Sequence, residues 1–224
     1  MALGRVFLPG PIRAWSALTR MALEGKLRLH LAASLSRILW ALLLSTIPAA
    51  ALGVAAGRSR RLDNCISPVI YLLHPLPKAA FLPVIMLFFG LGEASKIFLV
   101  GFIIFSQILV TLRDASKQVP TGLLDSVRSF GAGNTGLFIH VVIPAILPAF
   151  FSGLRVSLGT AVAVLFFAET FAAQSGLGFL IMDAWTRISY AEMYAGIMAL
   201  SLLGLLLFVL VDLIETLLCP WMKV

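Results

Sequence analysis

Long runs of hydrophobic residues, separated by short polar segments, dominate this chain. Ile38 to Ala56 carries no charged residue, and neither does Met193 to Val211. A membrane-spanning helix needs about 20 mostly apolar residues. Backbone groups in lipid must find partners within their own segment, so such runs are predicted to be helices. By this measure the chain has five candidate spans, at about residues 33–57, 66–91, 94–112, 143–170 and 194–217.

The N-terminal region has a different pattern. Ile12, Trp15 and Leu18 recur at helical spacing, with Arg13 and Arg20 on the other face. This pattern predicts an amphipathic helix at residues 12–29 that lies in a membrane interface. The predicted organisation is an interfacial segment at 1–32, a transmembrane domain at 33–218 that includes a cytoplasmic loop at 113–142, and a cytoplasmic tail at 219–224.

Composition agrees with a membrane protein and excludes other classes. Of the 224 residues, 60% are hydrophobic and only 12% are charged, and the mean hydropathy is +1.03. A soluble globule needs a polar surface that this chain cannot supply. Disordered proteins, disulfide scaffolds and cytosolic enzymes are therefore excluded. The predicted fold class is all-α, a polytopic membrane helix bundle.

The net charge of +7 indicates topology and not nucleic-acid binding. The basic residues are scattered, which is a weak electrostatic footprint for a nucleic acid. Under the positive-inside rule they mark the cytoplasmic face. One side of the spans carries Arg58, Arg60, Arg61, Arg113, Lys117, Arg128 and Lys223, whereas the other, after the first span, carries only Lys96 and Arg187. We therefore expect a cytoplasmic C-terminus.

Five basic residues near the N-terminus break this pattern. By parity the N-terminal stretch lies outside, yet it contains Arg5, Arg13, Arg20, Lys26 and Arg28. Two explanations remain open at this point. Either a flat helix lies at the outer interface, or a membrane helix is missing upstream.

The segment between the third and fourth predicted spans carries the clearest motif. Pro120 and Thr121 give a helix-start signal, and Gly131 is expected to end this helix as a C′ glycine. Asn134 or Thr135 is expected to cap a second helix. Between these signals an apolar stripe recurs at helical spacing, formed by Leu123, Leu124, Val127 and Phe130. The result is a cytoplasmic helix–turn–helix whose stripe suits a groove in another protein.

No nucleotide or metal motif accompanies this segment. Residues 131–136 match GxGxxG, but a predicted helix precedes them and no acidic residue follows at the required spacing. No phosphate-binding loop is present. The three histidines, His30, His74 and His140, lack ligand-spaced partners. Cys65 and Cys219 are expected to be reduced thiols. We expect this chain to bind no cofactor.

The stretch from Asp125 to Gly131, followed by His140 to Pro148, resembles the EAA loop of ABC-importer permeases. The family's Glu-Ala-Ala is Asp125-Ser126-Val127 here. Motifs at residues 57–61, 73–83, 89–96 and 175–178 resemble the nitrate/sulfonate/taurine-type branch. The resemblance covers about residues 8–218. Family members usually begin with a membrane helix before the segment matching residues 7–11, so we expect either a five-span protein or a late start.

The resemblance implies the permease subunit of an ATP-driven importer in the bacterial inner membrane, which is not itself an enzyme. It implies two ABC ATPase subunits that carry ATP and Mg, a second permease copy in a homodimer, and a periplasmic or lipid-anchored solute-binding protein. The implied solute is a small anion such as nitrate, a sulfonate, taurine or bicarbonate, and a thiamine precursor stays open. The alternative is a secondary transporter or a channel that ATP does not drive.

Two sets of residues are candidates for function. The ATPase-coupling set is Leu124, Asp125, Val127, Arg128, Phe130 and Gly131. The candidates for the translocation path or gate are Lys78, Gln107, Arg155, Ser157, Thr160 and Glu169, because polar groups within spans are costly unless they serve a function. Structural alternatives exist: Arg155 can snorkel, Glu169 can pair, and Asp125 with Arg128 can form a solvated pair. The GxxxG at Gly53 and Gly57 is expected to pack helices within one subunit.

Overall fold

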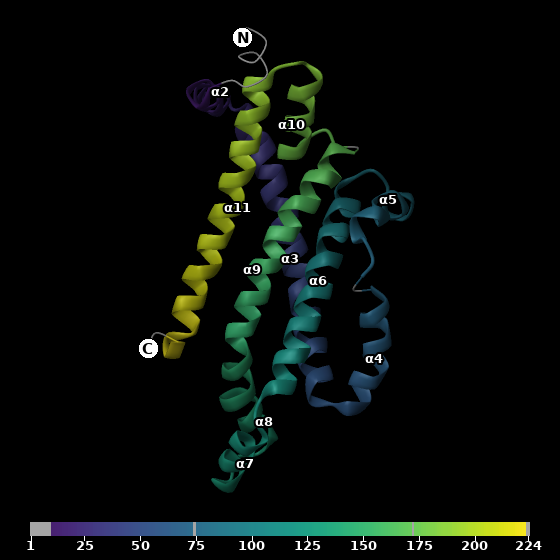
Figure 1. The fold of residues 1–224 in the computed structure, drawn as a ribbon, viewed down its shortest axis with the longest axis vertical. Coiled ribbons are helices and arrows are strands. Elements are labelled where there is room, and N and C mark those ends of the chain that lie inside the picture. The colour runs from purple at the N-terminus through teal and green to yellow at the C-terminus, as the bar shows by residue number, and fades with distance from the viewer. Residues whose placement is uncertain (1–9, 74, 172, 223–224) are drawn as a thin grey trace. The chain divides into compact units, whose positions relative to one another are not determined.

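A computed structural model describes residues 10–73, 75–171 and 173–222, and every regular element within these ranges is helical (Figure 1). The elements are α2 (Pro11–Leu23), α3 (Lys26–Arg58), α4 (Arg60–Leu73), η1 (Lys78–Phe81), α5 (Leu82–Phe89), α6 (Glu93–Gln118), α7 (Thr121–Ser129), α8 (Asn134–Leu137), the π-helix η2 (Phe138–Val142), α9 (Ile143–Thr170), α10 (Leu177–Thr186), α11 (Tyr190–Leu218) and η3 (Pro220–Met222). The all-α class is confirmed. The described residues do not include 1–9, at the start of the predicted interfacial segment, or 223–224, at the end of the predicted tail. His74 also lies outside them.

Among the described residues, four helical segments are long and apolar enough to cross a membrane: α3, α6, residues 134–170 and α11. The count rises to five if α4 and the helical stretch from Lys78 to Phe89 form one span. The fourth predicted span coincides with α9. Three others extend further than predicted, since α3 begins at Lys26, α6 ends at Gln118 and α11 begins at Tyr190. A polytopic helical bundle is therefore confirmed.

The second predicted span, residues 66–91, was wrong as a single helix. α4 ends at Leu73, and helical structure resumes at Lys78 with the 3₁₀ turn η1. Pro75 and Pro77 explain the interruption, because a proline has no amide hydrogen to donate and restricts the residue before it. Lys78 is therefore the first residue of the 3₁₀ turn that leads into α5.

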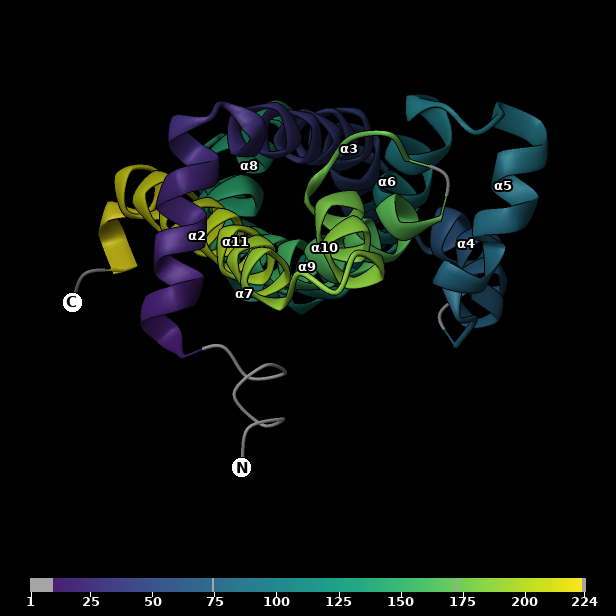
Figure 2. The same cartoon turned by 90° about the horizontal axis from the view of Figure 1, so that it is seen from above.

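The N-terminal amphipathic helix is present but ends earlier than predicted. α2 stops at Leu23, and Gly25 adopts a positive φ of 76°, a conformation that favours glycine. Trp15 stays exposed while Met21 is buried. Figures 1 and 2 show α2 across the directions of the first part of α3 and of α11, because it is seen end-on in one view and side-on in the other. This orientation suits an interfacial helix.

The chain divides into two compact units, which are described separately. The first unit comprises Met1–Leu42, Pro77–Gly101 and Gly159–Leu207. The second unit comprises Leu43–Leu76, Phe102–Leu158 and Phe208–Val224. The core of the first unit includes Leu165, Leu177, Leu180, Ala184 and Ala195, and that of the second includes Ile104, Ile108, Leu112 and Leu158.

Close helix packing in the second unit depends on the GxxxG motif of α3. A Cβ atom added at Gly53 would lie 2.7 Å from the carbonyl oxygen of Leu109, and one at Gly57 would lie 2.6 Å from the Cβ of Ser116. Such distances are far below van der Waals contact. Both glycines therefore let α3 approach α6 within the subunit, as predicted.

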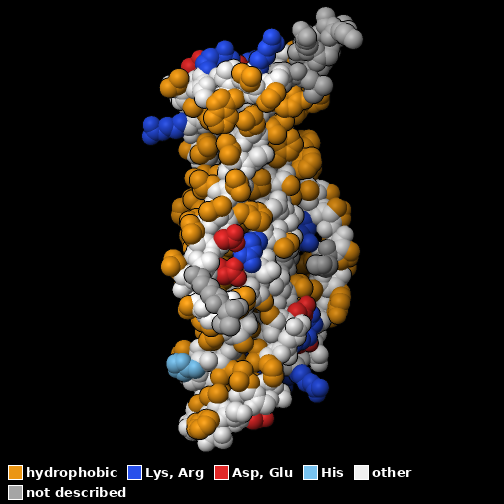
Figure 3. All heavy atoms as spheres, turned by 60° about the vertical axis from the view of Figure 1, so that its left-hand side comes forward, with side chains coloured by type: hydrophobic (Ala, Val, Ile, Leu, Met, Phe, Trp, Pro, Cys, Tyr) orange, Lys and Arg blue, Asp and Glu red, His pale blue; other side chains and the backbone are white. Residues whose placement is uncertain are grey.

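Apolar side chains cover much of the surface. Figure 3 shows one face on which hydrophobic side chains dominate and charged ones form small, separate groups. Large exposed hydrophobic residues occur on α3 and α11, among them Leu43, Leu44, Ile47, Leu205, Leu206 and Val209. A surface of this kind is unfavourable in water but suits contact with lipid.

Candidate functional site

The predicted helix–turn–helix is present in the second unit. α7 follows Pro120, and the amide of Gly131 donates to the carbonyl of Arg128 at 2.8 Å. Gly131 has a φ of 84°, so it is the left-handed C′ glycine that the sequence predicted. The predicted cap of the second helix was wrong by one residue. Gly133, in an extended conformation, precedes α8 and accepts the amide hydrogen of Leu137.

The apolar stripe of α7 divides into a packed part and an exposed part. Leu124 is buried and Val127 is half-buried. Leu123 and Val127 line a pocket together with His140, Val141, Pro144, Ala145 and Trp221. By contrast, the Phe130 side chain is 89% exposed. The packed part can fix α7 to its own subunit, while Phe130 is available to a partner.

Asp125 and Arg128 lie on the exposed side of α7. Arg128 Nη1 donates to Asp125 Oδ1 at 3.4 Å, and both side chains are more than half exposed. An exposed pair with this spacing contributes only a few tenths of a kcal/mol. The pair therefore constrains neither side chain strongly.

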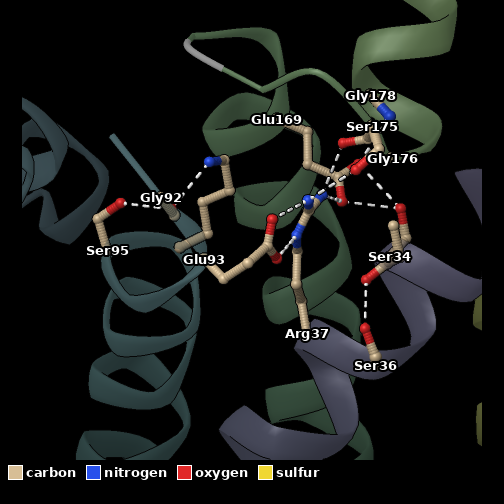
Figure 4. Close-up of polar contacts among 12 residues, drawn as sticks. Ser34, Ser36, Arg37, Gly92, Glu93, Ser95, Glu169, Ser175, Gly176 and Gly178 are labelled. Carbon is tan, nitrogen blue, oxygen red and sulfur yellow. Dashed lines mark hydrogen bonds and ion pairs between the residues drawn. The ribbon is translucent and has the colours of Figure 1, made fainter. Parts of the chain in front are cut away.

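A different kind of charge arrangement occupies the first unit. Arg37 of α3 reaches between Glu93, the first residue of α6, and Glu169, near the end of α9 (Figure 4). Its Nη1 donates to Glu169 Oε1 at 2.6 Å and to the carbonyl of Ser175 at 2.8 Å. Its Nε and Nη2 donate to the two carboxylate oxygens of Glu93 at 2.5 and 2.6 Å. Arg37 thus uses both edges of its guanidinium group.

The two carboxylates differ in their surroundings. The Glu169 side chain is 0% exposed, and it also accepts hydrogen bonds from Ser34 Oγ and from the amide of Gly178 at 2.8 Å. A Cβ atom at Gly176 would overlap the Glu169 carboxylate. The Ser175–Gly178 motif is therefore a glycine loop that closes over this group. The Glu93 side chain, in contrast, is 59% exposed.

Further buried polar groups surround this network. Lys96 is buried and donates to the carbonyls of Leu91 and Gly92 at 3.0 Å each. His30 Nδ1 accepts the amide hydrogen of Gly176 at 3.2 Å. The network therefore joins α3, the start of α6, the end of α9 and the loop before α10.

The remaining candidates for the path are divided between the two units. Lys78 and Thr160, both half-buried, belong to the first unit with Glu169, whereas Gln107, Arg155 and Ser157 belong to the second. Arg155 forms ion pairs with Asp212 and Glu215 of α11, so it joins α9 and α11 within the second unit. The Ser157 hydroxyl donates to the carbonyl of Gly153 at 2.8 Å.

Sequence reasoning missed Arg37, Ser34 and the role of Glu93. One signal was present, because Arg37 and Glu169 are isolated charges of opposite sign in apolar segments, and such residues usually pair. The sequence pattern was also interpreted for Arg113 and Lys117 only as a marker of membrane topology. Both bind Asp63 in the second unit, at 2.5 and 2.7 Å.

Charged groups also connect the elements around the short helix α10. Arg187 donates to Asp183 at 2.7 Å and to Glu192 at 2.9 Å. The Arg187 guanidinium holds the pKa of the Asp183 carboxyl below its ordinary range. Glu192 also lies 3.7 Å from Arg20 of α2. These pairs connect α2, α10 and the start of α11 within the first unit.

The thiols and possible metal ligands show no clustering. Cys65 is exposed and Cys219 is buried, and both are free. Burial raises the pKa of the Cys219 thiol. Over the ranges that the structure describes, no group of three or more His, Cys, Asp or Glu residues could hold a metal ion.

The described part of the chain is helical, with several helices that could span a membrane and a helix–glycine–helix loop between two of them, which agrees with the expected membrane permease. The chain belongs to the family described as binding-protein-dependent transport system inner membrane component, whose model matches residues 49–224. It is thus a multi-pass permease of the ABC-importer class.

Individual relatives agree with this assignment. The taurine transport system permease protein TauC of Escherichia coli (strain K12) is 32% identical over 221 residues, covering 96% of this chain and 80% of the relative. SsuC of the same organism, named for aliphatic sulfonate transport, is 33% identical over 214 residues, covering 96% and 81%. The formylaminopyrimidine transport permease protein ThiX of Halalkalibacterium halodurans is 29% identical over 216 residues, covering 96% and 86%.

Proposed function

We propose that this chain moves a small organic anion, a sulfonate or taurine, and couples to a separate ATPase through residues 121–137. The observation that carries the coupling role is the exposed end of α7. Phe130 presents an almost fully exposed ring next to the fixed turn at Gly131. An aromatic side chain on a short rigid helix is a suitable anchor for a groove in a partner.

Stiff connections support this role for the loop. Pro120 precedes α7, while Pro144 and Pro148 lie at the start of α9, and proline limits the conformations of the backbone. The buried Leu124 fixes α7 to its own subunit. ATP and Mg belong to the partner ATPase, which supplies the energy. In this proposal, Leu124, Val127 and Phe130 transmit the movement of the ATPase to α9.

The proposed assembly contains two copies of this chain, two ATPase subunits and an external solute-binding protein. The C-terminus and the loop at 113–142 lie in the cytoplasm in this proposal, since basic residues concentrate on that side. Lys78 and Gln107 are proposed for the path, together with Ser157 and Thr160. Glu169 and Arg155 are proposed to act as fixed or gating pairs, because both are held by opposite charges.

The anion class comes from the relatives named for taurine and aliphatic sulfonates. The relative named for formylaminopyrimidine supplies the competing substrate. Competition can separate these classes. Excess ethanesulfonate should block uptake of radiolabelled taurine, whereas formylaminopyrimidine at the same concentration should not.

Reconstitution in liposomes tests the proposal. The full chain, its co-encoded ATPase and its solute-binding protein should accumulate taurine only when ATP is supplied. Flux without ATP, or flux driven by an ion gradient alone, would favour a channel or a secondary transporter. Omission of the ATPase provides the control, because an importer should then be silent.

A further inference from the structure

We propose that the Nε/Nη2 edge of Arg37 is an anion-binding site that Glu93 occupies in this structure. A small oxyanion, such as a sulfonate or a carboxylate, binds this edge when the Glu93 side chain moves away. The link to transport depends on the proposed function above, but the binding site itself depends only on contacts within the first unit.

The two carboxylates on Arg37 are unequal, and this inequality identifies the exchangeable one. Glu169 is fully buried and also accepts hydrogen bonds from Ser34 and Gly178. Removing it would leave several donors without a partner. Glu93 is mostly exposed and bonds to the two nitrogens of one guanidinium edge. An incoming anion therefore has to replace only the contacts of Glu93.

The geometry of this edge selects the ligand. Two parallel N–H groups bind two oxygens of one group, which is the arrangement that guanidinium prefers for carboxylates and other oxyanions. A sulfonate also presents two oxygens in this way. A halide ion has only one centre, so it must accept both N–H groups at a single atom and cannot form two parallel hydrogen bonds.

The charge balance favours replacement by another anion. Arg37 and Lys96 are two buried cations, and Glu93 and Glu169 are two anions, so the group is neutral as a whole. When Glu93 moves away, two cations face one carboxylate, and one positive charge remains uncompensated. A buried charge without a partner is costly, and a bound monoanion restores neutrality.

The backbone around Glu93 permits this exchange. Glu93 follows Gly92, and a Cβ atom at Gly90 or at Gly92 would meet open space. Lys96 holds the carbonyls of Leu91 and Gly92, so the start of α6 stays fixed while the Glu93 side chain rotates. The exchange therefore needs a rotamer change and no movement of a helix.

Chemical rescue of a Glu93→Ala variant tests the site. The full-length chain in lipid nanodiscs is heated in sodium methanesulfonate and, separately, in sodium chloride of equal ionic strength. We expect Glu93→Ala to melt at a lower temperature than the wild type in chloride and to be stabilised by methanesulfonate. Glu24→Ala is the matched control, because Glu24 forms only an exposed 4.0 Å pair with Arg20. Its melting temperature should be the same in both salts.

A binding measurement without heating tests the anion site even if the Glu93→Ala variant folds poorly. The probe is trifluoromethanesulfonate, followed by the broadening of its ¹⁹F resonance. Glu93→Gln keeps the size of the side chain but loses its charge, so it should bind the probe about tenfold more tightly than the wild type, since one charged competitor is gone. Adding Arg37→Lys to Glu93→Gln should abolish the gain, because lysine offers no paired edge.

Two results would overturn the site. One is equal melting of Glu93→Ala in the two salts together with equal probe binding by Glu93→Gln and the wild type. The other is a gain that survives Arg37→Lys. No ATP is present in either assay, so a failure here leaves ATP-driven import untouched. If the anion binds but taurine uptake fails, only the proposed function is wrong.

Discussion

Two arginine–carboxylate pairs show how one chemistry serves different purposes in this molecule. Arg37 and Glu169 lie 2.6 Å apart in the first unit and are almost completely buried. Arg128 and Asp125 lie 3.4 Å apart on α7 in the second unit, and both are mostly exposed. Each pair lies within one unit. The two pairs are therefore compared by the burial of their side chains, and the placement of the two units does not enter the comparison.

Burial decides what each pair can do. A buried pair must stay satisfied, because removal of one partner leaves a desolvated charge. An exposed pair exchanges its partners for water at little cost. The Arg37 network is therefore suited to fixing structure, while Asp125 and Arg128 remain available for another protein. Substitutions that break each pair can test this difference.

The largest effect is expected from Glu169→Ala. This change leaves Arg37 and the donors of Ser34 and Gly178 without their buried acceptor. We expect a loss of about 3–5 kcal/mol in the free energy of unfolding. Unfolding of the purified chain in mixed micelles, followed by circular dichroism, measures the change.

The double variant Arg37→Met with Glu169→Met is the informative control. Because it removes both charges and retains apolar volume, it should recover the part of the stability that Glu169→Ala loses through the unpaired Arg37 charge. If the double variant is less stable than Glu169→Ala, the pair is not the source of the loss. A Glu169→Ala protein as stable as the wild type would contradict the comparison directly.

A smaller effect on stability, with a large effect on transport, is expected from Gly131→Val. Gly131 has a φ of 84°, and a left-handed conformation costs a residue with a Cβ atom about 1–2 kcal/mol. The turn after α7 would then change shape, and Phe130 would point elsewhere. We expect reduced stimulation of ATP hydrolysis and loss of taurine uptake in liposomes.

Gly133→Val is the matched control for this turn. Gly133 lies two residues further on, has a negative φ of −75°, and has open space at its Cβ position. It should retain coupled transport. Equal transport by Gly131→Val and the wild type would remove the turn from the coupling mechanism.

The hydrophobic pattern predicted most of the fold, because a segment that crosses lipid must satisfy its backbone hydrogen bonds internally and is therefore a helix. The fourth span coincides with α9, and the C′ glycine is at Gly131 as expected. The second span failed as one helix because apolar content alone ignores the effect of Pro75 and Pro77 on helix continuity. α10 was missed because it is too short to cross a membrane.

The buried network was predictable only in part. The sequence marks Arg37 and Glu169 as charges among apolar residues, but it does not show which helix faces which. The choice of Glu93 as the second partner depends on tertiary structure. So does the glycine loop at residues 175–178, whose motif was visible but whose contact with Glu169 was not. The sequence pattern therefore identifies the isolated charges, whereas tertiary packing determines which residues they pair with.

Asp183 and Arg187 form a case of intermediate burial, and pH can separate their effect from the others. Arg187 lowers the pKa of Asp183, so the pair stabilises the folded state fully above the ordinary carboxyl pKa of roughly 4. The contribution is lost as pH falls through the lowered pKa. We expect Asp183→Asn to reduce the melting temperature slightly at neutral pH and to have no effect in stronger acid. A difference from the wild type that persists at all pH values would show that the charge is not responsible.

The smallest effect on stability is expected from Asp125→Ala. The exposed pair with Arg128 has i,i+3 spacing, so its loss should change the free energy of unfolding by less than about 0.5 kcal/mol. If Asp125 nevertheless contacts the ATPase, co-purification of the ATPase should fall, and the fall should be larger at low salt because the contact is charged. Asp125→Glu, which keeps the charge on a longer arm, should retain more ATPase than Asp125→Ala. An Asp125→Ala protein with wild-type ATPase binding at every salt concentration would remove Asp125 from the coupling contact.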